Sequence, residues 1–132
     1  MSDNNDSDST FAGTWHSTYW YPSNDHSGED TSEYDVTVRQ DGNQLVIESQ
    51  RTENGSYILI RLSLDDDIAT GTWHESTAPE GDFKGMQYSG ALQLIISKDH
   101  QSMEGKWVGI GRDYELNRPD IYTGRWRLTR QA

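Results

Sequence analysis

The side chains with the clearest capacity for chemistry are a carboxylate and an indole that alternate along an extended segment. Glu75 lies two residues after Trp73, which itself follows Gly71 by two. Residues i and i+2 of a β-strand point to the same face, so a strand here would place the carboxylate beside the ring. A carboxylate on an inner face needs an arginine or a ligand donor as its partner. Glu75 is therefore the candidate for orienting a ligand, or for acid–base chemistry of an isomerase or cyclase type.

Arginines are the first partners to consider for this carboxylate, and the candidates are Arg61, Arg112 and Arg125. Arg61 is notable because it interrupts an apolar strand. Its parity is opposite to that of Ile60 and Leu62, so it is expected to point to solvent.

Tyrosines provide hydroxyl groups on the same predicted faces. Tyr19 and Tyr21 share the face of Trp15, and Tyr34 begins the next alternating segment. Tyr88 shares a face with Leu92 and could present its hydroxyl group to a ligand at the mouth of a cavity. These tyrosines and Glu75 form a predicted rim of mixed polar and aromatic character.

The tripeptide Gly-x-Trp occurs four times and uses four of the five tryptophans, namely Trp15, Trp73, Trp107 and Trp126. Each copy lies in a segment that otherwise resembles a strand. Glycine removes a side chain where a strand must bend or a large ring must fit. The stronger interpretation is that the four rings are core residues that close one end of the fold. The alternative is an aromatic wall that stacks a flat ligand.

The sequence gives little support for a metal site or for a catalytic nucleophile. The histidines His16 and His74 have outward parity, and no histidine pair has the spacing of a metal site. The absence of cysteine excludes thiolate catalysis and Cys-based sites. The glycines Gly109 and Gly111 are followed by no helix that could bind phosphate. We expect no metal and no cofactor.

Composition limits the class of protein further. The chain has 132 residues and a net charge of -11, so duplex nucleic acid is not an expected partner. There are only three lysines, and an acid excess with few lysines is typical of halophilic proteins. No apolar run is long enough for a bilayer. The acidic start of the chain does not resemble a secretory signal, so a cytoplasmic location is expected.

These candidate residues must be positioned by strands. Alternation of apolar residues predicts eight of them, with turn signals such as Asp41-Gly42 between them. The expected ranges are 11–21, 33–40, 44–52, 57–64, 68–77, 86–97, 102–112 and 121–130. Residues 1–10 are expected to be a disordered tail, and 11–132 a single all-β domain without significant helix. Short connections predict an eight-stranded antiparallel up-and-down barrel, with an open sandwich as the alternative.

The segment Phe11-Ala12-Gly13-Thr14-Trp15, on the first strand of such a barrel, resembles the calycins. This group contains the lipocalins, the fatty-acid-binding proteins and the avidins. The resemblance implies that the tryptophan lines a closed end and that a ligand enters from the other end. The lid helices of fatty-acid-binding proteins and the lipocalin cysteines are missing.

A longer resemblance runs from Thr70 to Gly111. The segments 70–77, 85–94 and 103–111 are similar to a β-barrel domain found at the C-terminal end of bacterial helix-turn-helix regulators, whose position implies a sensor. More distantly, the layout resembles the barrel that senses cyclic dinucleotides in CBASS anti-phage effectors. Phosphate recognition would need arginines at the mouth, and the candidates are Arg61, Arg112 and Arg118.

The expected function is a non-enzymatic binding or sensor module that takes a small, partly apolar ligand. Its predicted ligand-binding residues are Trp15, Tyr19, Trp73, Glu75, Tyr88, Trp107 and Trp126. Three alternatives stay open: a cyclic nucleotide sensor, a barrel enzyme that uses Glu75, and a filled barrel used for protein contacts. A homodimer is compatible with each of them.

Overall fold

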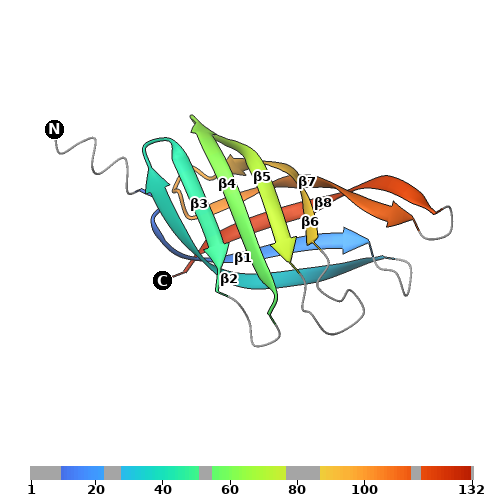
Figure 1. Ribbon diagram of the computed structural model, residues 1–132. Helices are drawn as coiled ribbons and strands as arrows, with labels where there is room; N and C mark the ends of the chain where they lie inside the picture. The colour runs from blue at the N-terminus through green and yellow to red at the C-terminus, as the bar shows by residue number, and fades with distance from the viewer. Residues whose placement is uncertain (1–9, 23–27, 51–54, 77–86, 114–116, 132) are drawn as a thin grey trace.

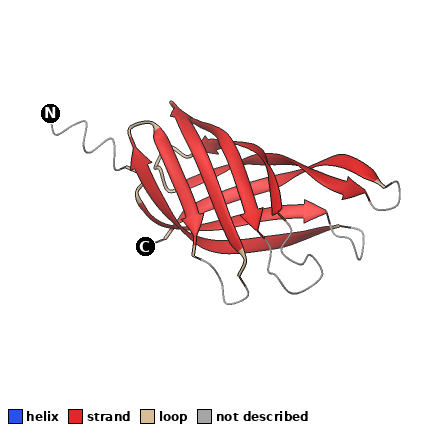
Figure 2. Ribbon diagram, viewed as in Figure 1, coloured by secondary structure: helices blue, strands red, loops and turns tan. Residues whose placement is uncertain are grey.

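A computed structural model of the protein describes residues 10–22, 28–50, 55–76, 87–113 and 117–131. Its eight strands form a closed barrel in which each strand pairs with its neighbours in the chain and β1 pairs with β8 (Figures 1 and 2). All neighbouring pairs are antiparallel. The strands are β1 (Gly13–Pro22), β2 (Glu29–Asp41), β3 (Gln44–Ser49), β4 (Tyr57–Asp65), β5 (Ile68–Ser76), β6 (Gln87–Ile96), β7 (Ser102–Asp113) and β8 (Arg118–Arg130). The predicted all-β up-and-down barrel is confirmed.

The described residues contain no helix, and so none with the length and hydrophobicity of a membrane span. Residues 1–9 of the predicted tail lie outside the described residues.

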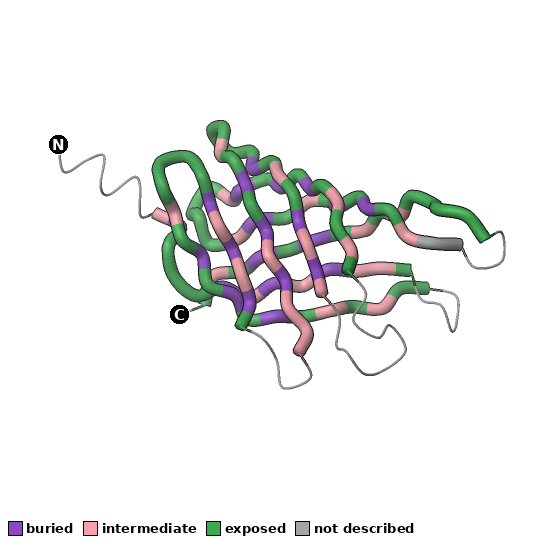
Figure 3. The backbone as a smooth tube through the Cα atoms, in the orientation of Figure 1, coloured by how far each residue is buried: buried purple, intermediate pink, exposed green. Residues whose placement is uncertain are grey.

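The barrel interior is formed by the apolar residues that alternate with polar residues along each strand. In β4, Ile58, Ile60 and Leu62 are almost fully buried, whereas Arg61 between them is exposed. Figure 3 shows the same alternation of buried and exposed positions along the other strands. Because successive side chains of a strand point to opposite faces, each strand contributes one row to the interior.

Short turns, the start of β1 and the end of β8 lie at one end of the barrel (Figure 1). The turn between β2 and β3 uses Gly42 at φ 61°, a left-handed conformation that favours glycine. Two interior rings close this end: Phe11 packs against Trp15 with ring centroids 6.4 Å apart and against His100 at 5.0 Å. The guanidinium group of Arg130 lies 4.9 Å from the centroid of the Trp15 ring. We call this the closed end.

The Gly-x-Trp tripeptides of β7 and β8 lie opposite each other, so that each glycine faces the tryptophan of the other strand. Gly105 pairs with Trp126, and Trp107 pairs with Gly124. A Cβ atom on Gly105 would lie 1.9 Å from the carbonyl oxygen of Gln93, so a backbone atom of the next strand fills the space beside this glycine. The tripeptide therefore allows close approach of strands and leaves room for a ring on the facing strand.

The sequence left open an aromatic wall made of all four tryptophans, but the four rings do not lie together. Trp73 packs edge-on against Trp107 and in a tilted arrangement against Trp126. Trp15 belongs instead to the closed end, where its ring packs against Phe11. The reason is strand position, because parity determines the face of a strand but not the height of a residue along it.

The hairpin of β7 and β8 extends beyond the rest of the barrel (Figure 1). Strand β8 begins at Arg118 rather than at the expected Ile121, and pairing with β7 continues to Asp113. Pairing of β7 with β6 ends at Gly109, and pairing of β8 with β1 ends at Trp126. We call the part beyond these positions the arm. Its outward side exposes Ile110 and Ile121, which are 57% and 64% exposed.

Candidate functional site

A buried carboxylate held by two phenols occupies the interior toward the end opposite the closed end. The hydroxyl groups of Tyr19 and Tyr34 donate to Oε1 and Oε2 of Glu75, each at 2.7 Å. The three side chains are only 8–9% exposed. Strand β5, which carries Glu75, pairs with β4 and β6 but not with β1 or β2. The two hydrogen bonds therefore cross the barrel interior, and we call these three residues the Glu75 triad.

A cluster of aromatic rings adjoins the triad through Tyr19. The ring of Tyr19 lies 4.7 Å from Trp126 and meets Trp107 edge-on at 6.2 Å, centroid to centroid. Trp73 lies 5.5 Å from Trp107 and 5.8 Å from Trp126. These separations are typical of favourable edge-to-face and tilted packing. Glu75 shares the inner face of β5 with Trp73, which belongs to this cluster.

Each interior indole already donates its N–H to the protein. Trp73 donates to the Val108 carbonyl oxygen at 3.2 Å, and Trp107 donates to the Trp20 carbonyl oxygen at 2.8 Å. Trp126 donates to the Ser17 hydroxyl oxygen at 2.8 Å, and Trp15 to the Phe11 carbonyl oxygen at 2.9 Å. A ligand in this region would therefore meet ring faces and edges rather than unpaired N–H donors.

The residues of this site retain a small solvent exposure. Trp73 and Trp107 are each 7% exposed, similar to the triad, whereas Trp15, Ile47 and Ile58 show none. Three more tyrosines that are partly buried pack against the core here or on the adjoining arm: Tyr21, Tyr88 and Tyr122. We call the triad, these tyrosines and the three clustered tryptophans the aromatic mouth.

The electrostatics of the mouth are negative. Burial raises the pKa of Tyr19, and the charge of Glu75 and the hydrogen bond to it raise that pKa further. Burial also raises the pKa of Tyr34, followed by its hydrogen bond to Glu75. The pKa of Tyr21 is raised by burial first and then by the charges of Asp30 and Glu75. All three phenols therefore remain neutral donors across the physiological range.

The structure brings together most of the residues that the sequence proposed for a rim. Tyr19, Tyr34 and Glu75 are hydrogen-bonded to one another, and Tyr88 is the register partner of Glu75 on β6. Trp73, Trp107 and Trp126 join them, and Trp15 does not, because it lies at the closed end.

None of the arginines considered as partners of Glu75 pairs with it among the described residues. Arg61 is exposed, and the guanidinium group of Arg125 stacks on the Trp20 ring at 4.3 Å. Arg118, which the sequence offered for phosphate recognition, is also exposed. The side chain of Arg112 lies outside the described residues. Sequence reasoning considered arginine and a ligand donor as partners, but the observed partners are tyrosines of two distant strands. It also did not single out Ser17 or Tyr122, although both share the parity of inward neighbours, Trp15 and Trp126 respectively.

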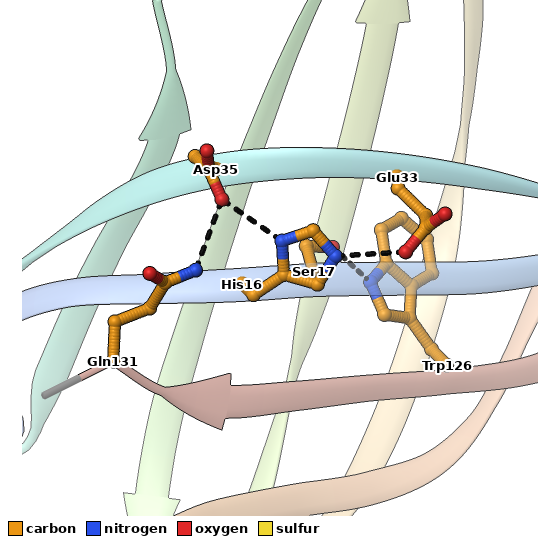
Figure 4. Close-up of polar contacts among 6 residues, drawn as sticks. All are labelled: His16, Ser17, Glu33, Asp35, Trp126 and Gln131. Carbon is orange, nitrogen blue, oxygen red and sulfur yellow. Dashed lines mark hydrogen bonds and ion pairs between the residues drawn. The ribbon is translucent and has the colours of Figure 1, made fainter.

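A second polar group lies on the outside of the barrel (Figure 4). His16 Nδ1 lies 2.9 Å from Asp35 Oδ1, and its Nε2 lies 2.9 Å from Glu33 Oε1. Gln131 donates to the same oxygen of Asp35 at 3.0 Å. The hydrogen bonds to Asp35 and Glu33 raise the pKa of His16. Among the described residues, no set of His, Asp and Glu side chains forms a metal centre.

The outer wall also carries a shallow, open pocket of about 320 Å³ over β4, β5 and β6. It contains no buried charge among its described lining residues, which are Leu59, Arg61, Thr72, Trp73, His74, Ser89 and Gly90. The aromatic mouth is therefore the stronger candidate site.

Comparison with known proteins finds no match to a family model, to a curated protein or to a solved structure.

Proposed function

We propose that this protein is a non-enzymatic binding or sensor barrel that takes a small, partly apolar ligand at the aromatic mouth. The observation that carries the proposal is the Glu75 carboxylate, which is 8% exposed and held by two phenols among large rings. Burying a carboxylate costs free energy that an apolar side chain of similar size would not. A barrel that only had to fill itself would gain stability from leucine at this position, so a recognition role accounts for the carboxylate.

The resemblance to calycins supports the same proposal. In a calycin-like barrel one end is closed by a tryptophan of the first strand and the ligand enters at the other. Here Trp15 is fully buried at the closed end, and the Glu75 triad, which is 8–9% exposed, lies toward the opposite end. The proposed mouth therefore lies where the resemblance would put it.

Cyclic dinucleotide sensing finds less support at this site. A phosphate about 4 Å from the carboxylate of Glu75 would be repelled by about 4 kcal/mol at an effective dielectric constant of 20. No described arginine pairs with Glu75 to offset that repulsion. Catalysis by Glu75 is also less favoured, because each of its oxygens already accepts a hydrogen bond.

The proposal is tested by native mass spectrometry after incubation with fractions of a small-molecule extract. We expect a fraction to leave a mass adduct on the wild type that is lost in Trp107→Ala, together with quenching of tryptophan fluorescence in the wild type. Lys106→Ala, an exposed change beside Trp107, is the matched control and should retain the adduct. Absence of any adduct from every fraction, or equal adducts in all three proteins, would contradict the proposal.

A further inference from the structure

We infer that the ligand recognised at the aromatic mouth carries an organic ammonium group, which Glu75 binds as counter-ion while the faces of the surrounding aromatic rings contact its alkyl shell. This inference rests on the proposed function and narrows it to a chemical class of ligand.

Charge is the first argument. Glu75 is paired only with neutral hydroxyl groups among the described contacts, and no described lysine, arginine or histidine forms an ion pair with it. A carboxylate offers about four lone-pair sites, and the two tyrosines use one on each oxygen. Acceptor capacity and one negative charge therefore remain for a cationic donor. Asp30, whose charge reaches Tyr21, adds a second negative group on the same side.

The aromatic surround is the second argument. The face of an aromatic ring carries a negative quadrupole, which attracts a cation within about 6 Å of the ring centroid. Tyr19, Trp73, Trp107 and Trp126 form one contact cluster, with centroids 4.7–6.2 Å apart. Their indole nitrogens already donate to protein acceptors, and Trp73 and Trp107 are each 7% exposed, whereas Trp126 is fully buried. A carboxylate among π-surfaces is the combination used to bind alkylammonium groups.

Other ligand classes fit this combination less well. A metal ion such as Ca²⁺ requires six to eight oxygen ligands, and no cluster of metal-binding side chains exists among the described residues. An anion would be repelled by the carboxylate of Glu75, which forms no ion pair among the described residues. A neutral apolar ligand would gain nothing from the carboxylate and would have to bury it further.

The experiment uses two pairs of probes that share shape and differ in charge. Choline is paired with its neutral isostere 3,3-dimethylbutan-1-ol, and 2-phenylethylamine is paired with 2-phenylethanol. Affinities are measured on the whole protein by calorimetry and by tryptophan fluorescence at neutral pH. We expect at least one ammonium probe to bind about 10-fold or more tightly than its alcohol.

Glu75→Gln should weaken binding of that ammonium probe by about 10-fold or more and leave the alcohol within about 3-fold. The matched control is Glu104→Gln, which removes an exposed carboxylate on β7 and should change neither affinity. Tyr34→Phe removes one donor and retains the charge of Glu75, so it should retain the preference for the ammonium probe. The comparison of the two probes in the wild type does not depend on the folding of any variant.

The inference is overturned if neither ammonium probe binds more tightly than its alcohol, or if Glu75→Gln folds and retains the preference. An adduct from the extract that is neutral or anionic would also overturn it, while leaving the proposed binding function intact. Absence of any adduct would instead remove the proposed function itself. The two failures are therefore distinguishable.

Discussion

At the scale of single residues, the barrel interior satisfies its polar groups by pairing them with one another. Ser17 and Trp126 are both fully buried, and the indole N–H donates to the serine oxygen at 2.8 Å. The Glu75 triad follows the same rule with phenol donors. A buried group that loses its partner pays its desolvation penalty in full, so these few contacts have a large influence on stability.

Ser17→Ala tests this rule. The change leaves the Trp126 N–H buried without its acceptor, and we expect the free energy of unfolding to fall by about 1–3 kcal/mol. Urea denaturation followed by tryptophan fluorescence measures the difference. The control is Ser63→Ala, whose hydroxyl group donates to Gln44 on the exposed surface and whose loss should cost less than about 0.5 kcal/mol. Equal losses for the two variants would contradict the expectation.

His16 provides a prediction about pH. Its folded-state pKa is raised, chiefly by the hydrogen bond to Asp35 and then by that to Glu33. A raised pKa means that the protonated imidazole contributes stability fully below its unfolded pKa of about 6.5, and that this contribution is lost as pH rises through the folded pKa. The side chain is 35% exposed, so solvent and salt reduce the effect on stability.

The measurement is an NMR titration of the His16 ring protons. We expect a pKa above about 6.5 in the wild type and a value closer to 6.5 in Asp35→Asn, with a smaller decrease in Glu33→Gln. A wild-type pKa at or below that of the Asp35→Asn variant would show that the ion pairs of Figure 4 do not form in solution.

At the scale of strands, glycine spacing determines how closely neighbours approach. A Cβ atom on Gly71 would lie 1.7 Å from the Arg61 carbonyl oxygen, which is a backbone atom and cannot rotate away. At Gly111 the nearest atoms belong to the Tyr122 ring, at 2.6 Å, and a side chain on the arm can move. The two positions therefore differ in what an added methyl group would displace.

We expect Gly71→Ala to lower the free energy of unfolding by about 3 kcal/mol or more, because β4 and β5 would have to separate. Gly111→Ala is the matched substitution and should cost about 1 kcal/mol or less. Thermal and urea denaturation of the two variants measure the difference in their free energies of unfolding. A Gly71→Ala protein as stable as Gly111→Ala would mean that the strand spacing adjusts more readily than the structure indicates.

The strands were predictable because alternation is a local property. Parity correctly placed Ile58, Ile60, Trp73 and Glu75 inside and Arg61 outside. The partners of Glu75 were not predictable, because parity gives the face of a residue and not its height, and Tyr34 lies 41 residues away on a strand that is not a neighbour. The sequence prediction started β8 too late, at Ile121, because it assigned Pro119 to a loop. On its N-terminal side of Trp126, β8 has no β1 partner among the described residues, so Pro119 is accommodated at a sheet edge.

At the scale of the whole molecule, self-repulsion is the dominant electrostatic effect. The net charge is -11, with 22 acidic residues against 11 basic ones. Compacting a chain of one charge sign costs free energy that salt reduces by screening. This acid excess is also the basis for the proposal that the protein is adapted to high salt.

We expect the melting temperature to rise by about 4 °C or more between 0.1 and 1 M KCl, equivalent to about 1 kcal/mol for a domain of this size. Differential scanning calorimetry gives the value. Sucrose at matched osmolality serves as the control, because it stabilises by exclusion from the surface without screening charge. A melting temperature that is unchanged or lower in KCl would contradict both the screening argument and the proposed adaptation.

The first and last described residues are hydrogen-bonded near one another at the closed end, and this has a consequence for engineering. The backbone carbonyl oxygen of Thr10 accepts a hydrogen bond from Arg130, and the Gln131 N–H donates to the Thr14 carbonyl oxygen at 3.0 Å. A short peptide spanning this contact would circularise the described domain, and new termini could be cut elsewhere along the barrel. Attachment to an electrode or bead through residues 10 or 131 would leave the aromatic rings directed away from the support.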